Sequence, residues 1–254
     1  MPHFDDQHVD LVRNGSYLVL RQLEQDVFGF WKGLAQATES RAQRDWLAAK
    51  LVGRWPSGAP LSLAPERDRP DLADVDDFGY AHDREGLRCP LGAHVRRANP
   101  RDAQLSDDPA LATRMARQHR ILRRSRPYGA PLHASFDVDA LLARGDDGVA
   151  RGLMFGCFNA DPSRQFELIQ EAWLHNPCFA HLRDEVDPLL RVGEPGSFTV
   201  QARPRPQHFH GLARAVTVRG AAYLFLPSVP ALRFLAAHAN QRFNNEGGAR
   251  DVAL

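Results

Sequence analysis

The stretch GVARGLMFGCFNADPSRQFELIQEAWLHN, residues 148–176, carries the clearest structural pattern in the chain. Its first part, Gly148 to Ala160, is a nearly continuous apolar run of the kind found in strands that are buried on both faces. Asp161 is a good N-cap, and Pro162 suits the first position of a helix. The helix that follows is predicted to bury Phe166, Ile169 and Trp173. The sequence therefore predicts a buried strand followed directly by an amphipathic helix.

The same alternation of strand and helix recurs along the chain. A strand begins at Ser16 with SYLVLRQ, and a helix follows in LEQDVFGFWKGLAQA, with a second helix from Arg41 to Val52 that Gly53 ends. Further predictions are a helix at 108–118, a short strand in HRILRR, a strand in VTVRGAAYLFLPS and a helix in VPALRFLAAHA. Without its insertions the order is strand, helix, strand, strand, helix, strand. This predicts an α+β fold with a ferredoxin-like antiparallel sheet and helices on one face.

The predicted domain occupies residues 16–240, between an N-terminal arm at 1–15 and a C-terminal tail at 241–254. Two long insertions interrupt it, at about 55–118 and 177–208, and both are rich in proline and charge. Long stretches without periodicity more often serve a functional site than a plain connection. We therefore expect the stretch from Trp55 to Cys89, in the first insertion, to carry function.

Composition limits the classes of partner. The chain has 254 residues and is 43% hydrophobic, enough for a proper core, and its 32 Lys and Arg nearly balance 31 Asp and Glu. A net charge of +1 gives no reason to expect nucleic-acid or membrane binding. Three widely spaced cysteines do not predict a disulfide framework. No leader or membrane-length apolar run is apparent, so we expect a soluble, cytoplasmic protein.

One histidine has an unusual setting, in CPLGAHVRRANPRD at Cys89–Asp102. Small residues precede His94, which would let the backbone approach a flat macrocycle, and arginines follow it. Neutral imidazole is a good axial ligand for haem iron, and Arg97 and Arg101 are candidates to pair with haem propionates. A histidine beside arginines is also common in ordinary surface loops. Spacing alone does not decide between these interpretations.

Several long motifs resemble the C-terminal half of dye-decolorising (DyP-type) haem peroxidases, in that family's order. They are RNGSYLVLRQLEQDV (13–27), GRWPSGAPL (53–61), DDFGYAHDREGLRCP (76–90), the histidine motif itself, ILRRSRPYG (121–129) and RGLMFGCFNADPSRQFELIQEAWLHNP (151–177). Together they cover most of the chain. The resemblance implies haem b as cofactor and hydrogen peroxide as oxidant, with organic reductants oxidised through a ferryl haem intermediate.

The resemblance also implies roles for two residues. His94 is the proximal iron ligand, and Arg123 in ILRRSRPYG is the distal arginine. A fixed, permanently protonated donor stabilises the negative charge that develops on the leaving oxygen when peroxide is cleaved. The alternative for Arg123 is an ordinary ion-paired strand arginine.

A proximal histidine normally donates its second ring N–H to an acceptor, often a carboxylate. Asp161, Glu167 and Glu171 are the candidates, with N-capping as the alternative for Asp161 and a solvated helix face for Glu171. His208 and His210 have an i, i+2 spacing that would place both imidazoles on one strand face, but no further spaced ligands accompany them.

One family feature is missing from this sequence. The family's distal aspartate lies in a Gly-x-x-Asp-Gly motif of the N-terminal half, and the chain has only a GDDG turn at 145–148. We therefore expect an isolated C-terminal half that needs an N-terminal-half subunit, or a second copy of itself, to cover an apolar sheet face. The residues expected on that face are Leu153, Phe155, Cys157, Leu224 and Leu226. Two alternatives are a non-catalytic haem-binding or cargo-type module, and a structural remnant without haem.

Overall fold

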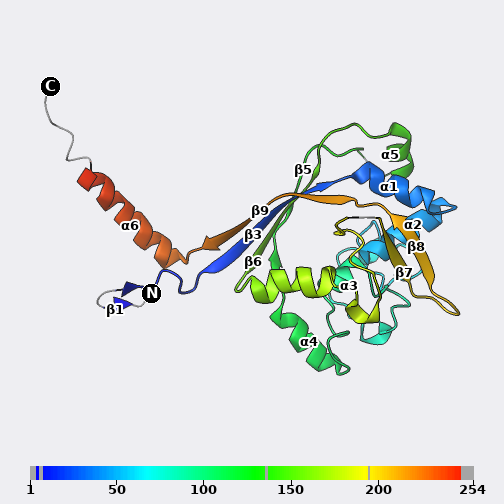
Figure 1. The fold of residues 1–254 in the computed structure, drawn as a ribbon, viewed down its shortest axis with the longest axis horizontal. Helices are drawn as coiled ribbons and strands as arrows, with labels where there is room; N and C mark the ends of the chain where they lie inside the picture. The colour runs from blue at the N-terminus through cyan, green and yellow to red at the C-terminus, as the bar shows by residue number, and fades with distance from the viewer. Residues whose placement is uncertain (1–3, 6–7, 135–136, 194, 247–254) are drawn as a thin grey trace.

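A five-stranded antiparallel sheet forms the centre of the fold (Figure 1). The computed structural model describes residues 4–5, 8–134, 137–193 and 195–246. The sheet consists of β3 (Ser16–Gln25), β4 (Leu122–Arg123), β5 (Arg126–Tyr128), β6 (Gly152–Asn159) and β9 (Val216–Leu226). Its strand order is β4-β6-β3-β9, and β5 also pairs with β6. The α+β, ferredoxin-like prediction is confirmed.

The crossover between β3 and β4 contains α1 (Val27–Gln36) and α2 (Arg41–Val52). The predicted ends of α2 are correct because both have local causes. The Ser40 hydroxyl accepts a hydrogen bond from the backbone N–H of Gln43, and Gly53 adopts a left-handed conformation with φ of 93°. Side chains from these two helices form one core cluster with the hairpin of β7 (Gly196–Val200) and β8 (Gln207–Leu212).

The second crossover lies between β6 and β9 and begins with η3 (Ser163–Glu167) and η4 (Ile169–Leu174). The burial of Phe166, Ile169 and Trp173 is confirmed. The winding differs from the predicted α-helix, because the backbone N–H of Glu167 donates to Pro162, five residues earlier. Both segments are therefore π-helical, a form often found at functional sites.

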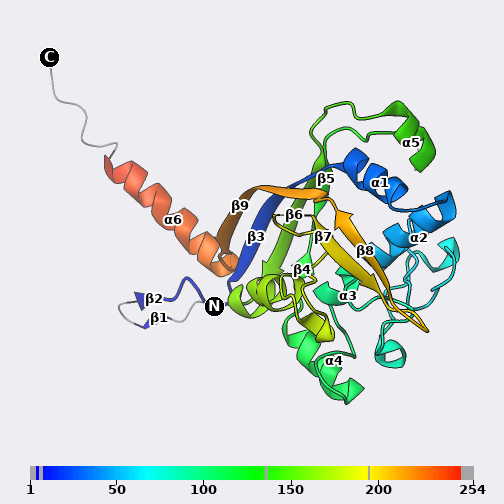
Figure 2. The ribbon, with the colours of Figure 1, turned by 45° about the vertical axis from the view of Figure 1, so that its right-hand side comes forward.

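The first insertion contains short helices and the second adds the β7–β8 hairpin (Figure 2). The elements of the first insertion are η1 (Pro70–Leu72), η2 (Ala81–Asp83), α3 (His94–Ala98) and α4 (Pro109–Gln118). The second insertion also contains η5 (Phe179–His181). Helix α5 (Val138–Arg144) lies between β5 and β6.

The two faces of the sheet differ in what covers them. Cross-strand partners share a face, and Val19 lies opposite both Cys157 and Tyr223. Phe166 of η3 covers this face, packed with Val19 and Cys157. The five residues predicted to form one exposed apolar face lie on two different faces, so this prediction is wrong. Leu153, Phe155 and Cys157 share the face of Val19, whereas Leu224 and Leu226 lie on the opposite face. Strand β6 was predicted to be buried on both faces. This prediction is wrong, because Met154 is 40% exposed.

The β1–β2 hairpin and α6 lie on the same side of the body of the fold (Figure 1). The predicted arm contains a small hairpin of β1 (Phe4–Asp5) and β2 (His8–Val9). Helix α6 (Val229–Glu246) includes the start of the predicted tail, and residues 247–254 lie outside the described residues. Over its described length, the structure contains no helix with the length and apolarity to cross a membrane.

Candidate functional site

His94 is the first residue of α3 and makes one polar contact that orients its ring. Its Nδ1 lies 2.9 Å from Oδ2 of Asp187, a residue 93 positions away in the second insertion. The imidazole is 25% exposed, while the Asp187 carboxylate is fully buried. The two insertions of the sheet therefore meet at this histidine–carboxylate pair.

The Asp187 carboxylate is itself fixed by the backbone around it. Its Oδ1 accepts hydrogen bonds from the N–H groups of Leu189 and Leu190, at 3.0 and 2.9 Å. Its own backbone N–H donates to the carbonyl of Leu174 at the end of η4, at 2.8 Å. One carboxylate oxygen therefore serves the local turn, and the other serves His94.

The charges of the pair reinforce each other. Burial disfavours both charged forms, but the charge of Asp187 and its hydrogen bond outweigh burial and raise the pKa of His94 above its ordinary value. In the same way, His94 and the two backbone N–H groups hold the pKa of Asp187 below its ordinary value. The nearby positive charge of Arg123 acts in the opposite direction and lowers the pKa of His94.

This geometry fits an axial ligand of haem iron. A carboxylate at Nδ1 keeps the proton on that nitrogen and leaves the lone pair of Nε2 for a metal. Within the described part of the chain, Nε2 has no hydrogen-bond partner. The chain therefore offers an oriented imidazole whose basicity is increased by a buried anion.

The carboxylate partner was predicted at the wrong residues. Asp161 is exposed, and its Oδ1 accepts the N–H groups of Ser163 and Arg164, so it acts as the helix cap that was its alternative. Burial and the neighbouring Glu167 together raise the pKa of Tyr223, which places Glu167 against β9. Glu171 is exposed. Asp187 takes the role instead, and the sequence analysis missed it.

Arg97 has a structural role in place of the predicted propionate contact. Its side chain is fully buried and donates to the backbone carbonyls of Trp173 and Asn176, at 2.8 and 3.0 Å, and to that of Glu185. It thus ties α3 to η4 and to the segment that carries Asp187. The side chain is withdrawn from solvent, with 0% of its surface exposed.

Arg101 also makes its polar contacts within the protein. It donates to the carbonyls of Asp76 and Phe78, at 2.9 and 3.0 Å, and to the Asp76 carboxylate at 3.0 Å. Its guanidinium carbon lies 3.8 Å from the centroid of the Phe78 ring. The two terminal nitrogens of Arg101 are therefore engaged by the preceding loop, and its contact with a haem propionate stays a prediction.

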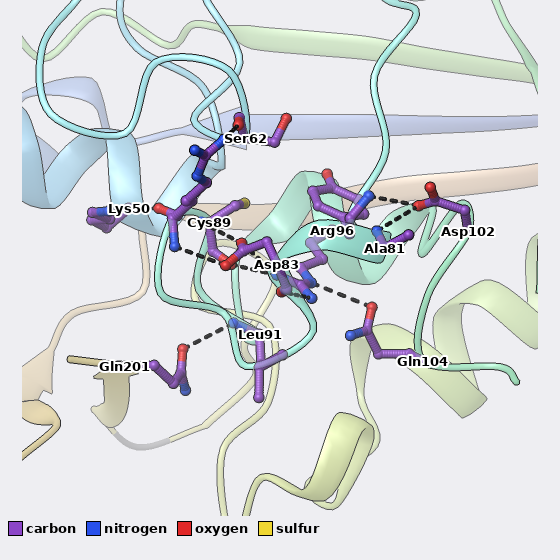
Figure 3. A network of polar contacts seen from close by, with 12 residues as sticks. Lys50, Ser62, Ala81, Asp83, Cys89, Leu91, Arg96, Asp102, Gln104 and Gln201 are labelled. Carbon is purple, nitrogen blue, oxygen red and sulfur yellow. Dashed lines mark hydrogen bonds and ion pairs between the residues drawn. The ribbon is translucent and has the colours of Figure 1, made fainter. Parts of the chain in front are cut away.

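A buried polar network holds the loop that precedes His94 (Figure 3). Arg96 is fully buried and donates to the Asp83 carboxylate at 3.0 Å and to the Cys89 carbonyl at 2.6 Å. Asp83 also accepts the backbone N–H groups of Arg88 and Cys89. Lys50 of α2 donates to the carbonyl of Arg88 at 2.6 Å. These bonds position the chain that enters α3.

Arg123 lies on β4 and remains available for chemistry. It is the cross-strand partner of Cys157, so it shares the sheet face of Val19. Its side chain is exposed, and its guanidinium has no ion pair or hydrogen bond among the residues that the structure describes. Its effect on His94 places the two charges within electrostatic reach.

The two histidines of β8 do not form a metal site of several ligands. The rings of His208 and His210 stack at a centroid distance of 6.4 Å, and Nδ1 of His208 lies 3.1 Å from the Thr199 hydroxyl. In the described part of the chain, no group of three His, Cys, Asp or Glu side chains could hold a metal ion.

The fold and the His94–Asp187 pair are those expected of a haem-ligating ferredoxin-like domain. The chain is 34% identical over 238 residues to the multifunctional dye peroxidase DyP2 of an Amycolatopsis species, covering 88% of this chain and 49% of that protein. It is 31% identical to the dye-decolorizing peroxidase msp1 of Mycetinis scorodonius, covering 91% of this chain and 48% of that protein.

Solved structures agree with the sequence matches. A dye-decolorizing peroxidase in complex with 2,6-dimethoxyphenol matches with a TM-score of 0.72 and 30% identity, over 86% of this chain and 51% of that one. No protein-family model matches. The chain therefore belongs to the DyP-type peroxidase family, and it spans about half the length of the curated relatives it matches.

Proposed function

We propose that this chain binds haem b through His94 and is the haem-binding half of a hydrogen-peroxide-dependent peroxidase that oxidises organic substrates. The observation that carries the proposal is the hydrogen bond from His94 to the buried carboxylate of Asp187. A histidine without a ligand does not require such a partner. Burying a carboxylate costs free energy, so we expect it only where the carboxylate orients or charges a neighbouring group. The family membership of the chain supports the same proposal.

When bound, haem supplies the redox chemistry of peroxide cleavage. The chain's own residues prepare the surroundings. Asp187 holds the proton of His94 on Nδ1, which orients the ring and increases its donor strength at Nε2. Arg123 presents a permanent positive charge on the sheet face, where it would stabilise negative charge on the departing oxygen without reorganising.

The second part of the proposal is a partner chain, an N-terminal-half subunit that closes the haem pocket and supplies the distal acid. Two features favour it. His94 is partly exposed and Arg123 is exposed, so this side of the site is open. In addition, five cavities of the described residues are lined by neither His94 nor Arg123. A second copy of the chain is the less simple way to close it.

Haem titration tests the proposal. Apoprotein produced with its partner should bind haemin with a Soret band, and His94→Ala should remove the band or sharply reduce haem retention. His119→Ala is a matched control, because Nδ1 of His119 contacts the backbone carbonyl of Arg164 and not Asp187. Normal loading of the His94 variant would end the assignment. Loading without any hydrogen peroxide turnover would instead favour a non-catalytic haem-binding module.

A further inference from the structure

Two neighbouring side chains close to His94 are deeply buried and have no role in the site described so far. Tyr80 is 1% exposed and Cys89 is 0% exposed. Both belong to the core cluster that includes Ala93, the residue before His94, and Cys89 opens the motif that contains this histidine. The structure therefore places a phenol and a thiol beside the segment that carries the proposed iron ligand.

The Tyr80 hydroxyl lacks the partner that a buried phenol normally has. Its oxygen is buried and forms no hydrogen bond of normal geometry among the described residues. An unsatisfied buried hydroxyl costs free energy and requires an explanation in a native protein. Burial raises the pKa of Cys89 to about 12, while the charge of Arg96 and the adjacent Tyr80 hydroxyl oppose this effect. The polar group that the phenol meets is therefore the Cys89 thiol.

The surrounding network fixes both residues of this pair. The guanidinium carbon of Arg96 lies 4.6 Å from the centroid of the Tyr80 ring, and Nη1 of Arg96 donates to the Cys89 carbonyl at 2.6 Å. The backbone N–H of Cys89 donates to the Asp83 carboxylate at 2.9 Å (Figure 3). The backbone N–H of Tyr80 donates to the carboxylate of Asp102. The phenol and the thiol are therefore held next to each other by bonds to both chain segments.

The ordinary oxidation of a cysteine by hydrogen peroxide is unfavourable at this position. The thiolate is the form that attacks peroxide, and the raised pKa keeps Cys89 as a neutral thiol at neutral pH. Burial also raises the pKa of Tyr80 well above its ordinary value. The pair therefore consists of a neutral phenol and a neutral thiol, and the chemistry left to it is oxidation with loss of hydrogen atoms.

We propose that Tyr80 and Cys89 become joined by a thioether bond when the haem-loaded protein meets hydrogen peroxide without an organic reductant. Tyr80 loses the hydrogen of its hydroxyl, Cys89 loses the hydrogen of its thiol, and hydrogen peroxide takes up both to give two molecules of water. Sulfur bonds to the ring carbon next to the hydroxyl, and the hydrogen of that carbon moves to the oxygen, which restores the phenol. The inference rests on the proposed function, which supplies hydrogen peroxide as the oxidant.

The bond would strengthen the loop that enters α3. It closes the chain between Tyr80 and Cys89 covalently, and a covalent closure restricts the unfolded chain more than the folded one. The loop already depends on the buried contacts of Arg96 and Asp83. Cross-linked protein should therefore unfold at a higher temperature than unreacted protein, and thermal unfolding measures the difference.

Peptide mass spectrometry tests the bond directly. The haem-loaded protein with its partner is treated with one equivalent of hydrogen peroxide, denatured, alkylated with iodoacetamide and digested with trypsin. Cleavage after arginine places Tyr80 in residues 68–84 and Cys89 in residues 89–96. We expect one joined species whose mass is the sum of these two peptides less two hydrogen atoms. Cys157 and Cys178 should be alkylated, and Cys89 should not.

Variants identify the partners of the bond. Tyr80→Phe keeps the ring and removes the hydroxyl, so the joined species should disappear and Cys89 should be alkylated. Tyr17→Phe is the matched control, because it removes a hydroxyl on β3 outside this core cluster and should leave the joined species in place. Apoprotein treated in the same way should show no joined species. Circular dichroism checks the folding of each variant.

Each outcome decides the inference. A joined species in the loaded protein alone supports it. Full alkylation of Cys89, or oxygen added to its sulfur, in loaded protein that consumes hydrogen peroxide would overturn the thioether and leave the proposed function intact. A joined species in the apoprotein as well would overturn the dependence on haem. A chain that loads no haem would count against the proposed function, and the inference would end with it.

Discussion

Replacing Asp187 by asparagine removes the negative charge beside His94 and nearly preserves the shape of the side chain. The two backbone N–H groups of Leu189 and Leu190 require an oxygen, so the amide oxygen should take the position of Oδ1. The amide NH2 then faces Nδ1 of His94. Because a donor at this position needs an acceptor, the neutral imidazole would carry its proton on Nε2, the nitrogen needed for iron.

The size of the effect follows from the bond that is lost. A hydrogen bond to a charged group contributes about 1.5–3 kcal/mol, and each 1.4 kcal/mol corresponds to a factor of about ten in affinity. Asp187 is fully buried, so solvent does not reduce its contribution. We therefore expect Asp187→Asn to bind haemin roughly ten- to a hundredfold more weakly than the unchanged protein, in line with the usual effect of losing a partner of a metal-ligating histidine.

Titration of the apoprotein with haemin, followed by Soret absorbance, measures this change. Asp161→Asn is the matched control, because it makes the same substitution at an exposed carboxylate that caps η3 and does not contact His94. Thermal unfolding of the apoproteins separates a folding defect from a binding defect. Wild-type affinity and an unchanged spectrum in Asp187→Asn would refute the proposed control of the tautomer.

Three further changes probe the rest of the structure. Arg123→Leu should retain haem but slow the reaction with hydrogen peroxide by roughly a hundredfold or more, because a preorganised charge is lost, and stopped-flow absorbance measures the rate. Arg96→Leu should lower the free energy of unfolding by about 3–5 kcal/mol in urea titrations, since it leaves Asp83 buried without its cation. Iodoacetamide at pH 8 should label native protein at Cys178 alone, because burial raises the pKa of Cys89 to about 12.

Each of these predictions has a control. An unchanged peroxide rate in Arg123→Leu, with a loss in Arg124→Leu, would transfer the distal role to the neighbour. Arg219→Leu breaks an exposed ion pair and should change the free energy of unfolding by less than about 1 kcal/mol. If Arg96→Leu had an equally small effect, the network of Figure 3 would not support the loop. Modification of Cys89 at the rate of Cys178 would show that its burial is transient.

Local signals explain what could be predicted from the sequence. Helix α2 begins after Ser40 and ends at Gly53 because both residues act on the backbone next to them. The order of the longer strands and helices follows from their apolar patterns, whereas β5 was not among the predicted strands. The π-helical winding of η3 and η4 was missed, since a change from four to five residues between hydrogen-bond partners barely alters the apolar pattern.

Tertiary placement explains what was missed. Arg97 follows His94 closely in sequence, yet its guanidinium turns into the core toward carbonyls that are 76 to 88 residues away. Asp187 lies in an insertion without periodicity, where no pattern distinguishes it from other carboxylates. One sequence feature could have pointed to Asp187. The first insertion was predicted to be functional because it lacks periodicity, and the second insertion lacks periodicity as well. A search for carboxylates in that second insertion would have included Asp187.

The 93-residue separation of His94 and Asp187 has a consequence for how this protein reaches its active form. Neither insertion can build the pair by itself. Closing the loop between the two residues costs conformational entropy, so we expect the pair to form only after the sheet has brought the two insertions together. A ligand that binds only the closed arrangement shifts the population toward it in proportion to its concentration. Haem would then favour the closed arrangement, and the protection of the second insertion from proteases should rise with haem concentration.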